Sequence, residues 1–279
     1  MAVRLVQQLK STSKHAHMHS NKWKGIFAPY EMITRISMIG NGKTSVTNKW
    51  IDETTGKNIK PVRISIEGNI GSGKTTLLEY FKRHSHVEVF TEPVNKWQNI
   101  GDGNALGLVY EDPSRWSFLF QSYVLLTMLE VHKTKQDHPV TLMERSIYSA
   151  SYCFVENLYQ SGKMSSVEYN VYQKWFNYIM KEDKPKLDLI VYLRTSPEEC
   201  YKRLKKRRRK EEIDIPMSLL ETIDQHHEDW LINKTKFDIP APVLVLDGNK
   251  DLKDMFKIYE TNTNSILLGM GDEPITCRD

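Results

Sequence analysis

The chain has 279 residues, of which 39% are hydrophobic and 10% aromatic, enough for one sizeable domain or two small ones. No apolar run approaches the ~18 residues that a transmembrane helix needs, which excludes a membrane-spanning protein. The formal net charge of +4 is unevenly distributed. Three cysteines, Cys153, Cys200 and Cys277, lack C-x-x-C spacing, which favours a reducing compartment over a zinc site or a disulfide framework.

The first 60 residues are predicted to form a basic leader. Residues 1–50 contain eight lysines and arginines against one acid, Glu31, a net charge of +7, so the remainder of the +4 chain carries −3. A leader rich in Ser, Lys and His and poor in acids resembles a mitochondrial transit peptide, and its start places Val3, Val6 and Leu9 on one helical face. A disordered basic tail on a cytoplasmic or nuclear protein is the alternative.

After the leader, strand and helix signals alternate along the chain. Short, mostly apolar segments followed by turn or helix chemistry predict five strands. They are residues 62–67, 87–92, 140–144, 187–194 and 242–247. Strands separated by helices indicate a parallel sheet covered on both faces, which is the three-layer α/β architecture.

The first predicted strand leads into a complete G-x-x-x-x-G-K-[ST] phosphate loop, and a helix follows. Between a strand and a helix, the loop N–H groups and the helix N-terminus converge on a phosphate chain. The alternative, a glycine-rich turn with a surface lysine, would not require a strand before it and a helix after it. Lys74 is expected to reach the β- and γ-phosphates, and the Thr75 hydroxyl to bind Mg²⁺. The expected phosphate-site residues are Gly68, Asn69, Ile70, Gly71, Ser72, Gly73, Lys74, Thr75 and Thr76.

Acidic residues end the next two predicted strands, at the sheet edge where ligands bind in open α/β folds. Glu92 is either a general base for an acceptor hydroxyl or the cap of the following helix. Glu144 stands where phosphate-loop proteins place an acid that helps to hold Mg²⁺. Arg145 offers a fork for the transferred phosphoryl group or for the acceptor's reacting end. A structural ion pair is the alternative for the last two.

Two predicted helices each carry a stripe of side chains. The first begins at Asp112-Pro113 and runs to about Val131, and the second begins after Arg145 with Ser146 as its cap and ends near Gly162. Taken alone, each stripe is more typical of a core than of a pocket, but a glutamine in the first keeps a pocket open as an alternative. The stripes are Gln121, Val124 and Met128, and Ala150, Phe154 and Leu158.

The most basic stretch, residues 202–210, has three competing interpretations: a nucleic-acid patch, a solvated helix face, or a lid that closes over ATP. Nucleic-acid binding is the weakest, because the body of the chain is net acidic. A lid would bring arginines to the phosphates. Glu211 or Glu212, directly after it, would then reach a sugar hydroxyl. The run His226-His227-Glu228 lacks metal-site spacing and is assigned to a surface helix.

These segments together resemble the deoxyribonucleoside kinases, in particular the thymidine kinase and multisubstrate branches. The likeness covers about residues 62–260 and includes EGNIGSGKTT (67–76), TEPV (91–94), MERSIYSA (143–150) and HEDWL (227–231). The resemblance implies a three-layer P-loop kinase fold with a five-stranded parallel sheet, flanking helices and an arginine-rich lid. It places a kinase domain at 61–268 and a C-terminal tail at 269–279, with ATP and Mg²⁺ as cofactors.

The resemblance also assigns roles at the reacting end of the site. Glu92 resembles the base that activates the 5′-hydroxyl of a deoxynucleoside, and Arg145 lies near that hydroxyl. Glu144 would serve the metal site. Arg207 and Arg209 resemble lid arginines that bind the phosphates.

At the nucleoside end, Tyr110 and Glu212 match the pair that binds the sugar 3′-hydroxyl in this family. Trp97 and Phe154 would pack around the base, as aromatic side chains do. Gln121 matches the residue that reads the base. Its carboxamide has donors and an acceptor, so it pairs with the edge of thymine or, after rotation, of cytosine.

Neighbouring positions favour pyrimidines. Related deoxycytidine and deoxyguanosine kinases carry an arginine and an aspartate where Met128 and Ala150 stand here, and the small Ala150 leaves space for the thymine methyl group. Leu158 agrees with the thymidine kinase branch.

The sequence therefore predicts a kinase that phosphorylates thymidine and deoxycytidine with ATP, and no nucleic-acid or membrane partner. The resemblance further implies a homodimer and inhibition by dTTP. A cytosolic or nuclear kinase that also accepts purines is one alternative, and a nucleotide-gated protein that binds nucleic acid is another.

Overall fold

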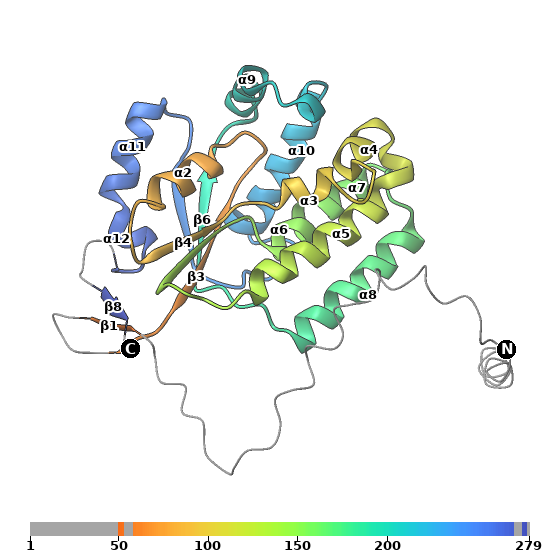
Figure 1. Ribbon diagram of the computed structural model, residues 1–279. Helices are drawn as coiled ribbons and strands as arrows, with labels where there is room; N and C mark the ends of the chain where they lie inside the picture. The colour runs from red at the N-terminus through yellow and green to blue at the C-terminus, as the bar shows by residue number, and fades with distance from the viewer. Residues whose placement is uncertain (1–49, 53–57, 271–274, 278–279) are drawn as a thin grey trace, which may run out of the picture. The chain divides into compact units, whose positions relative to one another are not determined.

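The computed structural model describes residues 50–52, 58–270 and 275–277 (Figure 1). Most of the predicted leader and of the predicted tail lies outside the described residues, and the transit-peptide prediction lies there too. The described residues on either side of these gaps form a small antiparallel sheet in the order β2-β1-β8. Its strands are β1 (Trp50–Asp52), β2 (Asn58–Ile59) and β8 (Ile275–Cys277).

The main sheet has five parallel strands in the order β4-β5-β3-β6-β7, which confirms the predicted architecture. Three strands are shorter than predicted. The second ends at Phe90, two residues before Glu92, so Glu92 lies in the loop that follows. The strands are β3 (Val62–Glu67), β4 (Val87–Phe90), β5 (Val140–Glu144), β6 (Leu189–Arg194) and β7 (Val243–Asp247).

Helices cover both faces of this sheet (Figure 1). Among the described residues no helix has the length and hydrophobicity to cross a membrane. The α-helices are α2 (Lys74–Phe81), α3 (Val94–Gln98), α4 (Ala105–Glu111), α5 (Pro113–Lys133), α6 (Ile147–Ser149), α7 (Glu156–Gln160), α8 (Ser166–Glu182), α9 (Pro197–Arg207), α10 (Met217–His227), α11 (Leu252–Thr261) and α12 (Thr263–Ile266). Shorter turns are a 3₁₀ segment, Lys210–Glu212, and two π-helical segments, Ala150–Val155 and Glu228–Ile232.

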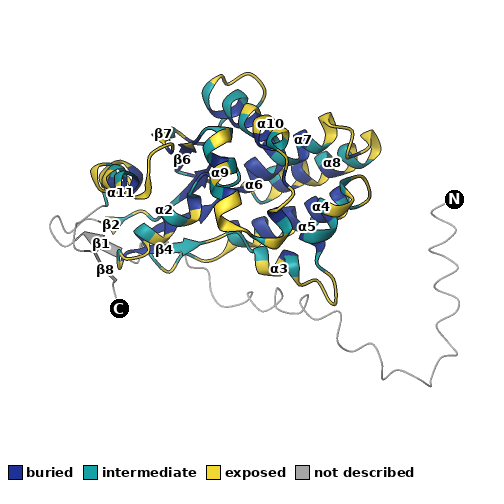
Figure 2. Cartoon of the chain, turned by 90° about the horizontal axis from the view of Figure 1, so that it is seen from above, coloured by how far each residue is buried: buried dark blue, intermediate teal, exposed yellow. Residues whose placement is uncertain are grey.

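The alternation of side chains along each strand divides the core in two. On β5, Leu142 packs with the cluster under α2 and α11, whereas the next residue, Met143, packs with the cluster under α5 and α8. On β6, Val191 and Tyr192 divide in the same way. Because the central strands are buried on both faces, the strands read as short, mostly apolar runs, which is why the sequence reveals them. Figure 2 shows buried residues along the central strands and the inner sides of the helices.

The two helices predicted to carry stripes are confirmed at their starts. The Asp112 side chain accepts a hydrogen bond from the Arg115 N–H at 3.2 Å, with Pro113 in the first turn of α5. Ser146 caps α6 through the Ser149 N–H. The second helix is not regular, however, because residues 150–155 are π-helical. Such wide turns often occur at functional sites.

The surface assignment of His226-His227-Glu228 is wrong. His226 and His227 are buried, and the His227 ring stacks on Tyr192 of β6 at 5.8 Å. Glu228 accepts a hydrogen bond from the Tyr192 hydroxyl at 2.9 Å. Burial lowers the pKa of His227 to about 3, so its ring is neutral. The polar sequence conceals that this end of α10 packs against β6.

Candidate active site

The phosphate loop connects β3 to α2, and its shape depends on glycine. Gly68 has a φ of 144° and Gly71 a φ of 81°. A Cβ atom at Gly68 would lie 2.7 Å from the Leu193 carbonyl oxygen, and one at Gly71 would lie 2.8 Å from that of Cys200. Only glycine fits such close approaches. The loop and the first turn of α2 also contain Asn69, Ile70, Ser72, Gly73 and Thr76.

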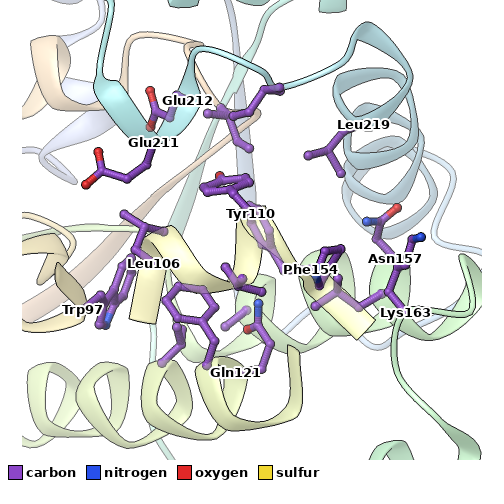
Figure 3. Close-up of a pocket in the computed structure, with 18 of the residues that line it drawn as sticks. Trp97, Leu106, Tyr110, Gln121, Phe154, Asn157, Lys163, Glu211, Glu212 and Leu219 are labelled. Atoms are coloured by element: carbon purple, nitrogen blue, oxygen red, sulfur yellow. The ribbon is translucent and has the colours of Figure 1, made fainter. Parts of the chain in front are cut away.

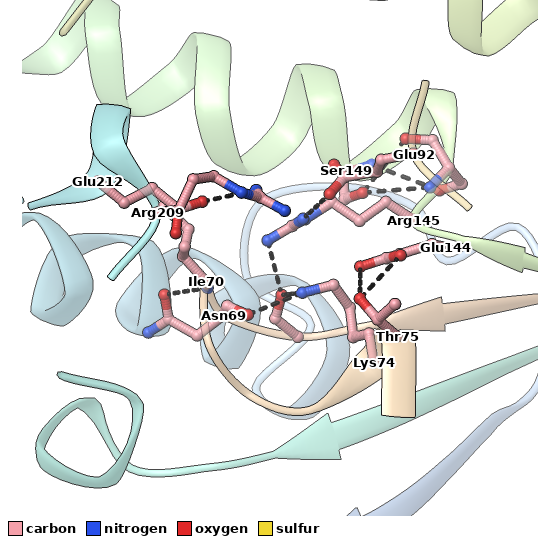
Figure 4. A network of polar contacts seen from close by, with 12 residues as sticks. Asn69, Ile70, Lys74, Thr75, Glu92, Glu144, Arg145, Ser149, Arg209 and Glu212 are labelled. Atoms are coloured by element: carbon pink, nitrogen blue, oxygen red, sulfur yellow. Dashed lines mark hydrogen bonds and ion pairs between the residues drawn. The ribbon is translucent and has the colours of Figure 1, made fainter. Parts of the chain in front are cut away.

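Lys74 is folded back over this loop. Its ammonium group donates to the carbonyl oxygens of Gly68 at 3.2 Å and Asn69 at 2.8 Å (Figure 4). Burial, followed by the charge of Arg145, lowers the pKa of Lys74 to about 8. The Asn69 amide donates to the Leu220 carbonyl at 2.8 Å, which ties the loop to α10. A phosphate chain in the loop would meet a buried cation.

Thr75 and Glu144 lie together at the start of α2 and the end of β5. The Thr75 hydroxyl donates to the two Glu144 carboxylate oxygens at 3.0 and 3.1 Å (Figure 4). Burial and then the neighbouring charge of Glu92 raise the pKa of Glu144. A hydroxyl and a carboxylate beside a phosphate loop are the hard oxygen ligands that Mg²⁺ prefers.

Arg145 contacts three separate parts of the chain. Its guanidinium group donates to the Glu92 carboxylate at 2.7 Å and to the Gly68 carbonyl at 3.2 Å, and it lies 4.7 Å from the centre of the Phe154 ring. The residue has a φ of 58°, in the left-handed region. The Arg145 side chain is 7% exposed, so this pair is largely shielded from water. The contact fixes Glu92 beside the phosphate loop.

Glu92 does not cap the helix that follows it. The N-cap of α3 is Pro93, and no side chain there accepts a hydrogen bond from the first turn. The cap interpretation is therefore wrong. The alternative of a strand-end ion pair between Glu144 and Arg145 is wrong in its partner, because Arg145 pairs with Glu92 across the site.

A cavity of about 680 Å³ opens next to Glu92 and Arg145 (Figure 3). Both predicted stripes line it. Val124 and Met128 also belong to the buried cluster, so core and pocket are the same surface here. The predicted nucleoside-site residues that line it are Glu92, Trp97, Tyr110, Gln121, Val124, Met128, Arg145, Ala150, Phe154 and Glu212, together with Leu158.

Gln121 is the polar group on the α5 wall of this cavity. It is 5% exposed, and its side-chain oxygen has no hydrogen-bond partner among the described residues. Trp97 lies nearby on α3, where its indole N–H donates to the Thr127 hydroxyl at 2.9 Å and its ring meets Phe120 edge-on. A buried amide that faces a cavity can pair with a ligand there, since buried polar groups are as a rule hydrogen-bonded.

The lid consists of the end of α9 and the segment 208–216. Arg207 and Arg209 both contact the Glu212 carboxylate, Arg209 at 2.8 Å. Arg209 and Glu212 line the cavity, whereas Arg207 does not. Burial, and then Glu212, raise the pKa of the Tyr110 hydroxyl, which places these two groups close together. In this arrangement the lid arginines face Glu212.

A family model for the deoxynucleoside kinases matches residues 64–267. The chain belongs to the deoxynucleoside kinase family. It is therefore a kinase with a nucleoside acceptor and a nucleotide phosphate donor, and not a nucleotide-gated binding protein. The P-loop kinase fold expected from the resemblance agrees with this membership.

Individual relatives agree with the family model. Mitochondrial thymidine kinase 2 of Homo sapiens is 53% identical over 204 residues, which cover 73% of this chain and 77% of that protein. The Macaca fascicularis protein of the same name is 50% identical over 218 residues, 78% of this chain and 82% of that one. Deoxycytidine kinase of Mus musculus is 39% identical over 231 residues, 72% of this chain and 89% of that protein.

The sequence did not single out several groups in this kinase's site. Arg203, within the basic stretch, donates to the carbonyl oxygens of Ser72 at 2.9 Å, Gly248 at 2.8 Å and Lys250 at 2.9 Å, so it joins the phosphate loop to the loop after β7. In the sequence, Arg203 is one of several lysines and arginines in the stretch 202–210, and no pattern distinguishes it from them. Further lining residues are Leu106, Phe120, Asn157 and Lys163.

Proposed function

We propose that this deoxynucleoside kinase transfers the γ-phosphoryl group of ATP to the 5′-hydroxyl of thymidine and deoxycytidine. The observation that carries the proposal is the buried Gln121 amide, which lines the cavity and whose oxygen has no partner within the part of the chain that the structure describes. Its carboxamide offers a donor and an acceptor to the edge of either pyrimidine. The names of the relatives, thymidine kinase 2 and deoxycytidine kinase, support the same two acceptors.

The side chains at positions 128 and 150 support pyrimidines over purines. Met128 and Ala150 carry no charge or hydrogen-bonding group toward the base, and Ala150 is small enough to admit the thymine methyl group. Trp97 and Phe154 supply the aromatic surfaces on which the base packs. Tyr110 and Glu212, at the lid side, are the proposed ligands of the sugar 3′-hydroxyl.

In the proposed reaction Glu92 accepts the proton of the 5′-hydroxyl while that oxygen attacks the γ-phosphorus. The bond from the γ-phosphorus to the bridging oxygen breaks, and ADP leaves. Arg145 holds Glu92 at 2.7 Å and offers its remaining N–H groups to the 5′ end. Lys74 and the N–H groups of the phosphate loop bind the β- and γ-phosphates.

Thr75 and Glu144 are the proposed holders of Mg²⁺, which when bound would neutralise charge on the donor phosphates. The lid residues Arg207 and Arg209 would leave Glu212, or share it, to reach the same phosphates. Phosphoryl transfer leaves little covalent work to a protein, so positioning and charge account for the expected catalysis.

Initial rates with ATP-Mg²⁺ against thymidine, deoxycytidine, deoxyadenosine and deoxyguanosine test this proposal. Activity on the two pyrimidines and little on the purines is expected. Comparable rates on purines would overturn the assignment of Gln121, Met128 and Ala150 as a pyrimidine site. No turnover of any of the four would overturn the proposed reaction.

A homodimer is the proposed assembly. The neighbouring helices α5 and α8 each expose apolar side chains, and those on α8 recur on one face: Leu119 and Leu126, and Val167, Val171, Trp175 and Tyr178. Exposed apolar surface of this kind marks association sites. Light scattering should give twice the monomer mass of 32.6 kDa. Trp175→Glu should give the monomer, and a monomeric unmodified chain would contradict the proposal.

Mitochondrial location is proposed from the basic leader and from the word mitochondrial in the names of the thymidine kinase 2 relatives. A fluorescent fusion of the full chain should enter mitochondria, whereas a fusion that lacks residues 1–47 should stay outside. Equal distributions of the two fusions would contradict it.

A further inference from the structure

Glu211 connects the lid to the opposite wall of the nucleoside pocket. The same carboxylate oxygen, Oε1, accepts two hydrogen bonds, one from the Gln98 amide at 2.8 Å and one from the Asn104 amide at 3.0 Å. Both donors are more than a hundred residues away in the chain, at the end of α3 and just before α4. Figure 3 shows Glu211 on the same side of the pocket as Leu106 and Trp97.

The two donors are held by the pocket wall itself. The Asn104 side-chain oxygen accepts from the Gly107 N–H at 2.8 Å and so caps α4, which leaves the amide nitrogen to face Glu211. Gln98 directly follows Trp97, whose indole is fixed by its hydrogen bond to Thr127. Asn104 is thus tied to the start of α4, and Gln98 lies at the end of α3; both helices line the cavity.

Glu211 is a charged acceptor in these contacts. Burial acts to raise its pKa, but the hydrogen bonds, that of Asn104 foremost, keep the pKa below its usual value. Hydrogen bonds to an ionised carboxylate are about twice as strong as those between neutral groups. The contact is therefore strong enough to hold a short segment of chain.

The two adjacent glutamates engage different partners. Glu212 is buried and binds Arg207 and Arg209, whereas Glu211 is half-buried and binds the α3–α4 wall. The segment is also anchored behind them, since Ile215 packs into a small apolar cluster with Leu220. Fixing Glu211 thus fixes the position of Glu212 over the pocket.

We propose that Glu211, Gln98 and Asn104 form a latch that holds the lid across the nucleoside pocket. In this proposal Glu211, which lines the cavity beside Glu212, is a positioning residue: Gln98 and Asn104 hold its carboxylate, and through this contact it keeps Glu212 in place for the sugar and slows the escape of the bound nucleoside. The inference rests on the proposed nucleoside site. Because the latch joins the lid only to the nucleoside wall, it affects the nucleoside more than the phosphate donor.

Asn104→Asp breaks the latch while it keeps the cap of α4. Aspartate caps helices as well as asparagine does, but it replaces the amide donor with a carboxylate that repels Glu211. In the full chain we expect the KM for thymidine to rise about 10-fold, and kcat and the KM for ATP to change less than about twofold. Release of thymidine, followed by stopped-flow tryptophan fluorescence, should accelerate by a similar factor.

Adding Glu211→Gln to Asn104→Asp exchanges donor and acceptor, since the new amide can donate to the new carboxylate. This double variant should recover most of the lost affinity, a result that a merely structural role would not produce. Glu211→Ala, which leaves the α4 cap untouched, should raise the KM as Asn104→Asp does. Glu221→Gln, at an exposed position of α10, is the matched control and should behave as the unmodified chain.

The outcomes separate the latch from the function on which it rests. An unmodified chain that neither binds nor phosphorylates a pyrimidine deoxynucleoside would overturn both. If that chain is active but Asn104→Asp and Glu211→Ala leave the thymidine KM and release rate unchanged, the latch alone is overturned. Failure of the double variant to recover affinity, with both singles impaired, would also overturn it.

Discussion

The proposed phosphate end of this site is built around one stretch of chain, residues 68–76, to which Glu144 and the lid arginines are added, whereas the proposed nucleoside pocket is assembled from α3, α4, α5, the first π-helical segment, α10 and the lid. The phosphate end is closed by buried polar contacts such as those of Lys74 and Arg145. The pocket is mostly apolar, and its Gln121 oxygen is left open. In the proposed function, the phosphate charge is bound by a local, prearranged backbone, and the base by side chains that tertiary packing brings together.

Removal of the buried cation Lys74 is expected to impair the phosphate end most. Lys74→Met should reduce kcat/KM for ATP by about 10²–10³, the scale on which a charge-stabilising donor acts. The same change should make the folded chain more stable at pH 7, by about 1–2 kcal/mol, because a buried ammonium group is costly and only part of that cost is offset by its two hydrogen bonds. Urea denaturation at pH 7 measures this gain.

The gain in stability should depend on pH. Burial lowers the folded-state pKa of Lys74 to about 8, below its ordinary value of 10.5. Between these values the unfolded chain binds more protons than the folded one, so the free energy of unfolding of the unmodified chain rises with pH through this group. The advantage of Lys74→Met should therefore shrink from pH 8 toward pH 10. A constant difference would contradict the burial of a charged Lys74.

Glu92→Gln tests the group that links the two ends. A glutamine still accepts the hydrogen bond of Arg145, so nucleoside binding should persist while kcat falls by about 10² or more, the usual scale for a general base. Steady-state rates with thymidine, beside a calorimetric Kd, separate the two effects. Glu79→Gln, on the exposed side of α2, is the control. Near-normal turnover of Glu92→Gln would remove Glu92 from the mechanism.

Gly68→Ala tests the backbone of the phosphate end. Its new Cβ would lie 2.7 Å from the Leu193 carbonyl oxygen at a φ of 144°, and we expect a loss of about 3 kcal/mol in the free energy of unfolding. Gly162 also has a positive φ, 70°, but nothing lies within 4 Å of its Cβ position. Gly162→Ala should therefore lose only about 1 kcal/mol. Equal losses, measured by urea denaturation, would show that close approach does not matter at Gly68.

The smallest expected effect is at the nucleoside end. Gln121→Ala should raise the KM for thymidine and for deoxycytidine by about 10-fold, because one or two hydrogen bonds to the base are lost. Gln225→Ala, on the exposed face of α10, is the control and should leave both constants unchanged. An unchanged KM for both nucleosides in Gln121→Ala would show that this amide belongs to the core and does not read the base.

The contrast between the local phosphate end and the assembled nucleoside pocket explains which features the sequence predicts. The five strands, the phosphate loop and the positions of Glu144 and Arg145 follow from short-range patterns: apolar runs, glycine spacing, and polar residues at strand ends. The caps of α5 and α6 follow from single residues, Asp112 and Ser146. These features depend on residues only a few positions apart, so they can be predicted from the sequence.

The remaining features depend on contacts between distant segments. Helical periodicity identifies the face that carries Gln121, but not that a cavity of about 680 Å³ opens in front of it. Polarity alone misplaced His226 and His227, because only the packing of α10 on β6 buries them. The partners of Glu211 are more than a hundred residues away.

The sequence by itself therefore determined the parallel α/β fold, the phosphate loop and the kinase family of this protein. Only the tertiary structure decided which side chains share the cavity and which partners each of the two lid glutamates contacts there. The physical reason is range: backbone conformation and capping depend on adjacent residues, whereas cavities and ion pairs depend on where folding brings remote ones together.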